Sequence, residues 1–487
     1  MKITKIEISD FRGFPGKAPY DFEFGNARNL FIWGENGSGK TSLCRAIQEF
    51  FNLSKDAKSF TDHKNTLDPA CVTGHVAVHF DDGSIQSWQC GGDRPLRQPP
   101  ALQTALQVGC LTYRNLLETN FTQHGDNVNL FDIAVWHLLP HVEVATSIGS
   151  RRIVELWEYV ESINPARKGH YKSYIDNCDR AINRFNTGFQ PLIQPLIDKA
   201  TELLSRFNEP DLTLGAAFRK VEYDRTTREF KNTDLLLSVL KSGTQLQKHH
   251  NFLNEARLSA IAIAIYLAGL LISVPGTSPF PKLLVLDDVL VGLDMANRLP
   301  VLSILAEYFA DWQIILLTYD RVWYEMVQVD LDAVYLRTDN WRFYELWLDK
   351  DGVTPVHCWR GNDGGFNFFL SRAQEHLNTN DFRAAGVYAR AAFETKLKIY
   401  CDKKGVPVPY RKPPKHIDAE TFWRAAVKHA LEAARKVGNE RVLAAHFRFV
   451  YRVKQVVLNP LSHSATQPIA RPEIQAAIDA VRTLRFE

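Results

Sequence analysis

The sequence GENGSGKTS, residues 34–42, fits the phosphate-loop pattern G-x-x-x-x-G-K-[ST] at every fixed position. Its glycines allow a tight turn, so that main-chain N–H groups converge on the phosphates of a nucleoside triphosphate. We expect Lys40 to reach the β- and γ-phosphates and Thr41 to offer its hydroxyl to Mg²⁺. The predicted cofactors are therefore ATP and Mg²⁺. The predicted nucleotide-binding residues of this segment are Gly34, Asn36, Gly37, Ser38, Gly39, Lys40, Thr41 and Ser42.

The segments on both sides of the loop predict a buried strand and an amphipathic helix. Residues 29–33 form a short apolar run, and residues 42–51 carry apolar side chains at helical spacing. A helix that begins at the loop presents the positive end of its dipole to the phosphates. Farther along, residues 74–80 and 84–88 predict a hairpin around Asp81-Asp82-Gly83.

Residues 282–288 (KLLVLDD) predict a second buried strand, which ends in two carboxylates. An apolar strand that ends in Asp is what a Walker B site requires. We expect Asp287 to hold Mg²⁺ through its water shell, because Mg²⁺ prefers oxygen ligands and keeps several waters. Asp288 is the predicted general base that orients the attacking water. Lys40 and Asp288 are thus the expected catalytic residues.

Composition and charge limit the classes of protein that fit. The 487 residues are 45% hydrophobic and 23% charged, which predicts a globular chain of two or three domains. The apolar runs fall short of a membrane span, and the seven cysteines form no C-x-x-C pair, so we expect a cytoplasmic protein without a membrane partner or zinc site. From residue 365 onward there are 21 Lys and Arg against 11 Asp and Glu. This basic tail suggests a nucleic-acid partner, and a solvated basic surface is the alternative.

Several of these segments resemble the SMC/RecF-like branch of the ABC ATPases. The N-terminal strand is followed by a similar turn, Phe11-Arg12-Gly13-Phe14, and Gly292-Leu293-Asp294 matches the D-loop of the family. The resemblance implies that Arg12 lies near the nucleotide, with a surface turn arginine as the alternative. It also implies that Asp294 lies at an interface between two protomers, so that the chain assembles with itself.

The sequence departs from the family pattern at several positions, two of which bear on the rate of hydrolysis. Residues 253–259 stand where the family has its LSGGQ signature; the resemblance implies that Asn254 and Arg257 contact the γ-phosphate of the opposite protomer, and a helix capped by Asn254 is the alternative. Tyr319 stands in place of the switch histidine and cannot act as a protonatable imidazole near neutral pH. Asp288 replaces the more usual Glu, so both changes predict slow hydrolysis. After residues 108–113 we find no clear glutamine for the Q-loop.

The C-terminal part is predicted to be helical, with helices over residues 366–378, 381–401, 419–436, 440–458 and 471–484. It resembles a HEPN domain, and the PrrC anticodon-nuclease family joins such a domain to an ABC-like ATPase. Arg390 and Glu394 share a helix face, and His463 follows a later helix, which implies a candidate RNase site of Arg390, Glu394 and His463. The usual Arg shortly before the His is missing, so the alternative is a structural ion pair and a packing histidine.

The predicted fold is thus α/β: an ABC/SMC-like P-loop ATPase head with an antiparallel β lobe and a short helical insertion, plus a C-terminal all-α bundle. The predicted domains are 1–131 (phosphate-loop half), 132–245 (helical insertion, interrupted at Pro191 and Pro195, and returning strands), 246–360 (signature, Walker B and D-loop half) and 365–487 (HEPN-like).

The predicted function is that of an ATPase that oligomerises with ATP and controls a separate effector nuclease in bacterial antiphage defence. One alternative is a HEPN RNase toxin gated by its own ATPase domain. Another is a RecF-like DNA-repair ATPase whose nucleotide state sets its affinity for DNA.

Overall fold

The computed structural model describes all residues except 17, 26–27, 55–56, 68–71, 122, 125–126, 164–170, 208, 210, 228, 275, 331–339, 350–354, 361–364, 409–418, 463–469 and 487. The chain divides into two compact units. The first comprises Met1–Arg342 and Leu346–His357, and the second comprises Phe343–Glu345 and Cys358–Glu487.

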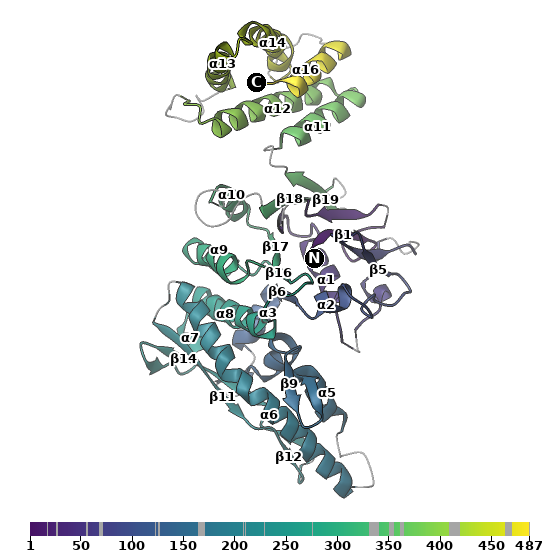
Figure 1. The fold of residues 1–487 in the computed structure, drawn as a ribbon, viewed down its shortest axis with the longest axis vertical. Coiled ribbons are helices and arrows are strands. Elements are labelled where there is room, and N and C mark those ends of the chain that lie inside the picture. The colour runs from purple at the N-terminus through teal and green to yellow at the C-terminus, as the bar shows by residue number, and fades with distance from the viewer. Residues whose placement is uncertain are drawn as a thin grey trace. The chain divides into compact units, whose positions relative to one another are not determined.

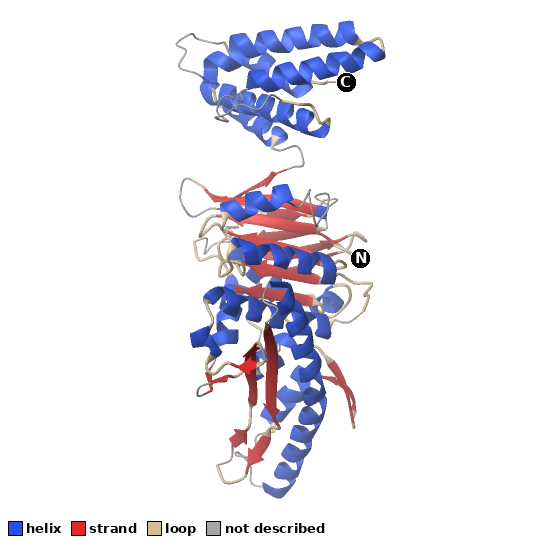
Figure 2. Ribbon diagram, turned by 90° about the vertical axis from the view of Figure 1, so that its left-hand side faces the viewer, coloured by secondary structure: helices blue, strands red, loops and turns tan. Residues whose placement is uncertain are grey.

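The core of the first unit is a mainly parallel sheet (Figures 1 and 2), and the phosphate loop follows the carboxyl end of one of its inner strands. Among the described residues its strand order is β19 (Pro355–Arg360), β18 (Trp341–Leu348), β3 (Asn29–Gly34), β17 (Gln313–Thr318), β16 (Leu283–Asp287) and β6 (Val108–Thr112). Strands β3, β17, β16 and β6 run parallel, with Trp33 opposite Thr318 and Leu317 opposite Asp287. Because parallel strands end at the same edge, the two predicted halves of the nucleotide site meet there.

Ten helices are described in this unit. They are α1 (Lys40–Phe50), α2 (Ala101–Ala105), α3 (Tyr113–Phe121), α4 (Phe131–Ile133), α5 (Ile153–Ser162), α6 (Tyr171–Leu204), α7 (His249–Phe252), α8 (Glu255–Ser273), α9 (Met295–Tyr308) and α10 (Arg321–Asp330). Helix α8 is buried on all sides from Leu258 to Gly269, as an evenly apolar core helix should be. By length and composition it could also cross a membrane, which corrects our expectation that every apolar run is too short, but 67% of it is buried in the protein.

An antiparallel sheet packs beside the parallel one and confirms the predicted hairpin. Its order is β2 (Tyr20–Glu23), β1 (Ile3–Ser9), β4 (His75–Phe80) and β5 (Ile85–Gln89). Phe11, from the turn that follows β1, packs against Phe60 and Trp88 with ring centroids 5.7 and 6.3 Å away. This buried aromatic group anchors the turn that carries Arg12.

The insertion differs in two respects from the sequence prediction. Helix α6 runs without interruption through Pro191 and Pro195, so the predicted break is wrong. The two prolines lie four residues apart and are exposed, whereas the opposite face buries residues such as Phe189 and Leu196. Burial of that face outweighs the two lost backbone hydrogen bonds.

The second difference is that strands occur where only helices were expected. The missed strands form a hairpin of β9 (Glu143–Thr146) and β10 (Gly149–Arg152), whose exposed residues give little hydrophobic alternation. The remaining strands of the insertion are β11 (Leu212–Arg219), β12 (Glu222–Asp224), β13 (Glu229–Lys231), β14 (Asp234–Lys241) and β15 (Thr244–Gln245), and two short strands, β7 (Gln123–His124) and β8 (Asn127–Val128), precede it. Strands β11, β12 and β14 confirm the returning strands that were predicted for the end of the insertion.

The second unit is a helical bundle, as predicted. Its helices are α11 (Phe366–Asn378), α12 (Phe382–Lys403), α13 (Ala419–Lys436), α14 (Glu440–Val453), α15 (Asn459–Ser462) and α16 (Arg471–Thr483). A π-helical turn, Lys454–Leu458, continues α14. Small side chains such as Ala389 and Ala430 let the helices approach closely around larger core residues, among them Phe393 and Trp423.

A pair of phenylalanines on α14 tests this core. Phe447 is 3% exposed and its ring lies 5.7 Å from that of Trp423, whereas Phe449 is 51% exposed. We expect Phe447→Ala to lower the free energy of unfolding of the bundle by about 3–5 kcal/mol, because it leaves a cavity. The control, Phe449→Ala, should change it by no more than about 0.5 kcal/mol. Denaturant unfolding followed by circular dichroism measures both; equal losses would contradict the assigned core face.

Candidate functional site

The phosphate loop connects β3 to α1 and is shaped by its glycines. Gly37 and Gly39 have φ of 88° and 99°, in the left-handed region where a side chain would be strained. A Cβ on Gly34 would lie 2.4 Å from the Ser38 hydroxyl and 3.2 Å from the main-chain oxygen of Leu346, so a larger residue here would displace its neighbours. Asn36 and Gly37 lie exposed at the crest, while Ser38, Gly39 and Lys40 are buried.

Lys40 is held at the centre of the loop. Its Nζ donates hydrogen bonds to the main-chain oxygens of Gly34 (2.8 Å) and Glu35 (3.1 Å), and it lies 3.9 Å from Oδ2 of Asp288. Burial lowers the pKa of the Lys40 ammonium, while the carboxylates of Asp288 and Asp287 act in the opposite direction. The Lys40 ammonium therefore lies near two acidic groups at the carboxyl end of β16.

Asp287 is the last residue of β16 and is 4% exposed. Burial raises its pKa to about 6, with the nearby charge of Asp288 acting in the same direction and the Thr41 hydroxyl opposing it. Its Oδ1 atom is buried and has no hydrogen-bond partner among the described residues. A buried carboxylate oxygen without a partner is costly, and a cation or its bound water at this point would remove that cost.

Asp288 adopts a left-handed backbone conformation, with φ of 53°. Asp and Asn enter this region more readily than Glu, which gives a physical reason for the shorter acid at this position. Its Oδ1 accepts a hydrogen bond from the main-chain N–H of Tyr319 at 2.9 Å. Burial also raises the pKa of Asp288, and the Lys40 charge opposes this. Tyr319 thus contacts the acid through its backbone, while its side chain is 43% exposed.

The turn that carries Arg12 touches the phosphate-loop helix. The main-chain N–H of Gly13 donates to the Ser42 hydroxyl at 3.2 Å, and a Cβ on Gly39 would lie 3.0 Å from the Phe14 ring. Arg12 itself has φ of 49°, and its main chain bonds to the carbonyl of His63 and the side chain of Asn65. Arg12 is exposed, and no hydrogen bond or ion pair of its side chain within the described residues reaches the loop.

These residues fit a magnesium-bound nucleotide. The Ser38 hydroxyl, like Oδ1 of Asp287, is buried and has no hydrogen-bond partner in the described part of the chain. The loop supplies glycine-shaped backbone and a buried ammonium, and Thr41 and Asp287 supply two of the oxygens that Mg²⁺ prefers. The donor set therefore matches the predicted cofactors.

The residues predicted to act on an opposite protomer lie apart from the loop. Asn254 caps α8 by accepting a hydrogen bond from the N–H of Arg257 (3.0 Å), and the Arg257 side chain pairs with Glu209 (2.8 Å). Asp294 caps α9. Within the residues that the structure describes, no hydrogen bond or ion pair joins Asn254, Arg257 or Asp294 to the phosphate loop. The helix-cap alternative for Asn254 is therefore observed.

The structure also identifies a polar pair that the sequence did not suggest. Thr112 ends β6 opposite Asp287, and its N–H and hydroxyl both donate to Oδ1 of Asn115, at 3.0 and 2.7 Å. Asn115 thus stands just after the strand where a Q-loop glutamine was expected. The sequence offered one signal for Asn115, which is its position after a buried strand. A search for a Q-loop glutamine does not find it, because the residue is Asn.

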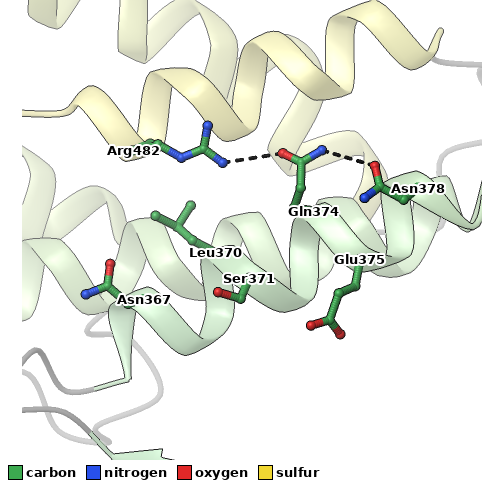
Figure 3. A pocket seen from close by; sticks show the side chains of 7 residues that line it. All are labelled: Asn367, Leu370, Ser371, Gln374, Glu375, Asn378 and Arg482. Atoms are coloured by element: carbon green, nitrogen blue, oxygen red, sulfur yellow. Dashed lines mark hydrogen bonds between the residues drawn. The ribbon is translucent and has the colours of Figure 1, made fainter.

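The C-terminal candidates are only partly described. Arg390 donates from Nε to Glu394 at 2.9 Å, with 23% and 33% of the two side chains exposed, which is the geometry of an ordinary helical ion pair. His463 lies outside the described residues. An open pocket of about 430 Å³ lies between α11 and α16 (Figure 3), lined by polar side chains that include Ser371, Gln374 and Arg482. It holds no cluster of acids and bases among the described residues, so we place the candidate site at the phosphate loop.

Comparisons with known proteins add little beyond this geometry. No family model and no curated protein matches the chain. Among solved structures it is similar to an Smc head bound to the C-winged helix domain of ScpA, at 16% identity and a TM-score of 0.41, covering 74% of this chain and 98% of that one. It is also similar to an Smc head with an extended coiled coil bound to the C-terminal domain of ScpA, derived from Pyrococcus furiosus (14%, 0.38, 74% and 96%).

A third similar structure is the SMC head domain from Thermotoga maritima, at 14% identity and a TM-score of 0.34, covering 74% of this chain and 99% of that one. At these identities and TM-scores the likenesses establish neither a family nor a function. The functional assignment therefore depends on the residues around the phosphate loop.

The raised pKa of Asp287 predicts a dependence of stability on pH. The ordinary value is 3.8, so the folded protein holds this proton until about pH 6 while the unfolded chain loses it near pH 4. This contribution to stability is present below about pH 4 and is lost as the pH rises through about 6. The free energy of unfolding of Asp287→Asn, relative to that of the wild type, should therefore rise between these pH values, by at most about 2–3 kcal/mol.

Denaturant unfolding in EDTA, without nucleotide, measures this gain at several pH values. Glu325→Gln, in an exposed ion pair with Arg321, is the matched control and should show no such pH-dependent gain. A constant difference between Asp287→Asn and wild type across the range would contradict the assigned pKa.

Proposed function

We propose that this protein is an ATP-binding and slowly hydrolysing ABC/SMC-like ATPase, which assembles with itself when ATP is bound and regulates an effector nuclease in bacterial antiphage defence. The observation that carries the ATPase part is the meeting of Lys40 with Asp288 at 3.9 Å, with the buried Asp287 beside them. A phosphate-loop lysine and a strand-end acid pair at one sheet edge are the parts that phosphoryl transfer requires.

Each residue has a distinct role in this proposal. Lys40 and the loop N–H groups bind the phosphates, and Thr41 and Asp287 hold Mg²⁺, which when bound neutralises charge on the phosphates. Asp288 accepts a proton from the attacking water, and the Tyr319 N–H fixes the direction of that carboxylate. Slow turnover follows because Asp288 is short and its neighbour Tyr319 offers no protonatable imidazole.

The proposed assembly uses the surface around the α8 N-terminus. A Cβ on Gly292 would lie 2.3 Å from the Ser259 hydroxyl, so the D-loop-like turn packs directly on α8. Asn254 and Asp294, which lie close to this contact in sequence, are both exposed. A second protomer could therefore meet both segments at once, which supports their proposed action across an interface.

The regulatory role rests on resemblance, as an analogy between compact ATPases of this branch. The effector is proposed to be a separate protein because Arg390 and Glu394 form an ordinary ion pair. The competing alternatives are an RNase in this chain and a RecF-like DNA-binding ATPase.

Two substitutions separate nucleotide binding from hydrolysis. Lys40→Ala should weaken binding of a fluorescent ATP analogue at least about ten-fold, because it removes the buried phosphate ligand. Asp288→Asn keeps the left-handed backbone and should bind ATP as the wild type does, but hydrolyse it about 100-fold more slowly.

Light scattering after gel filtration should then show dimers of Asp288→Asn with ATP and Mg²⁺, and a monomer under all conditions would refute the assembly.

The location of the effector is tested in cells that carry the gene with its neighbours. Lys40→Ala and Asp288→Ala should each abolish protection from phage, because both disable the ATPase. His463→Ala should leave protection intact. If His463→Ala also abolished protection, the RNase would lie in this chain. Tight, salt-sensitive DNA binding that depends on ATP would instead support the repair ATPase.

A further inference from the structure

We propose that the outer face of α14 and the π-helical turn after it is a docking surface for an acidic amphipathic helix of a partner protein. We call it the α14 face, and it consists of Arg441, Val442, Ala445, Arg448, Phe449, Arg452, Gln455 and Val456. This inference does not depend on nucleotide binding, since all of these residues lie in the second unit.

The apolar members of the α14 face follow a seven-residue spacing. Val442, Phe449 and Val456 are 58%, 51% and 59% exposed. The opposite side of the same helix supplies Leu443, Phe447 and Val450 to the core, so the exposed row is a second apolar stripe and not part of the bundle. Single exposed apolar residues are common, but these three recur at every seventh residue, as one of the two core positions of a helix–helix seam does, and Ala445 and Arg452 stand at the other.

The charged members of the α14 face are all basic. Arg441, Arg448 and Arg452 form no hydrogen bond or ion pair with any described residue. The one acid on α14, Glu440, forms an ion pair with Arg435 at 2.7 Å. Arg441 and Arg448 directly precede Val442 and Phe449, so they flank the stripe as the charged flanking positions of a coiled coil do.

This combination favours an acidic helix over other occupants. A second copy of the chain would bring arginine rows against each other, and like charges at such positions are unfavourable. A nucleic acid would pair with the arginines and stack on Phe449 but gain little from Val442 and Val456, which have no aromatic face. A helix with apolar residues at seven-residue spacing and flanking Glu or Asp satisfies both the stripe and the arginines.

A charge-exchange experiment tests the proposal with the full-length protein. The probe is a labelled three-heptad peptide with Leu at both seam positions and Glu at the flanking positions; a second peptide carries Lys in place of Glu. Fluorescence anisotropy should show that the wild type binds the Glu peptide at least about ten-fold more tightly than the Lys peptide. Arg441→Glu with Arg448→Glu should reverse this preference, and Phe449→Ala should weaken both complexes about ten-fold.

The matched control is Arg383→Glu with Lys428→Glu, which changes the net charge equally at exposed positions of α12 and α13. It should bind the Glu peptide as the wild type does, and thermal unfolding should show that every variant is folded. Equal binding by the two double variants, or no preference of the wild type for Glu over Lys, would overturn the proposal. Displacement of the Glu peptide by oligouridine, with tighter binding of that RNA at the same arginines, would make the face a nucleic-acid interface instead.

Discussion

The parallel pairing of β3, β17 and β16 is the constraint on which the candidate site depends. Their hydrogen-bonded register places Trp33 beside Thr318 and Leu317 beside Asp287, so three chain segments far apart in sequence end within one small region. A shift of one residue in the pairing of β16 with β17 would point Asp287 to the other side of the sheet, and the same shift between β17 and β3 would turn Trp33 over. These strands are buried along their whole length, and the register of their main-chain pairing sets which side chains meet at their carboxyl ends.

Most of this arrangement could be predicted because its signals are local. Glycine spacing, an apolar strand and a helical pattern around Lys40 are all written in consecutive residues, and so are the helices of the second unit. The predicted break in the insertion helix was wrong because tertiary packing, and not local sequence, determines whether that helix continues. Pro191 and Pro195 would break an isolated helix, but burial along the other face of α6 keeps it whole.

The site's finer geometry depends on contacts between distant segments, which no local pattern contains. The hydrogen bond from Gly13 to Ser42 and the packing of Phe14 on Gly39 join residues far apart in the chain. These contacts hold the loop from the neighbouring turn, and Lys40 holds it from within by hydrogen bonds to the Gly34 and Glu35 carbonyl oxygens. The loop is thus held in shape by this chain's own groups, which reduces the ordering that a ligand must impose.

The left-handed backbone at Asp288 has a genetic consequence. Among the side chains that tolerate this conformation, Asn differs from Asp by one nucleotide in the codon. With Asp288 as the proposed general base, that single mutation would preserve the turn and the nucleotide pocket while greatly slowing turnover. One base change in this codon therefore separates the protein from a variant that binds ATP and hydrolyses it far more slowly. Such a variant would remain in the ATP-bound state for much longer in each cycle.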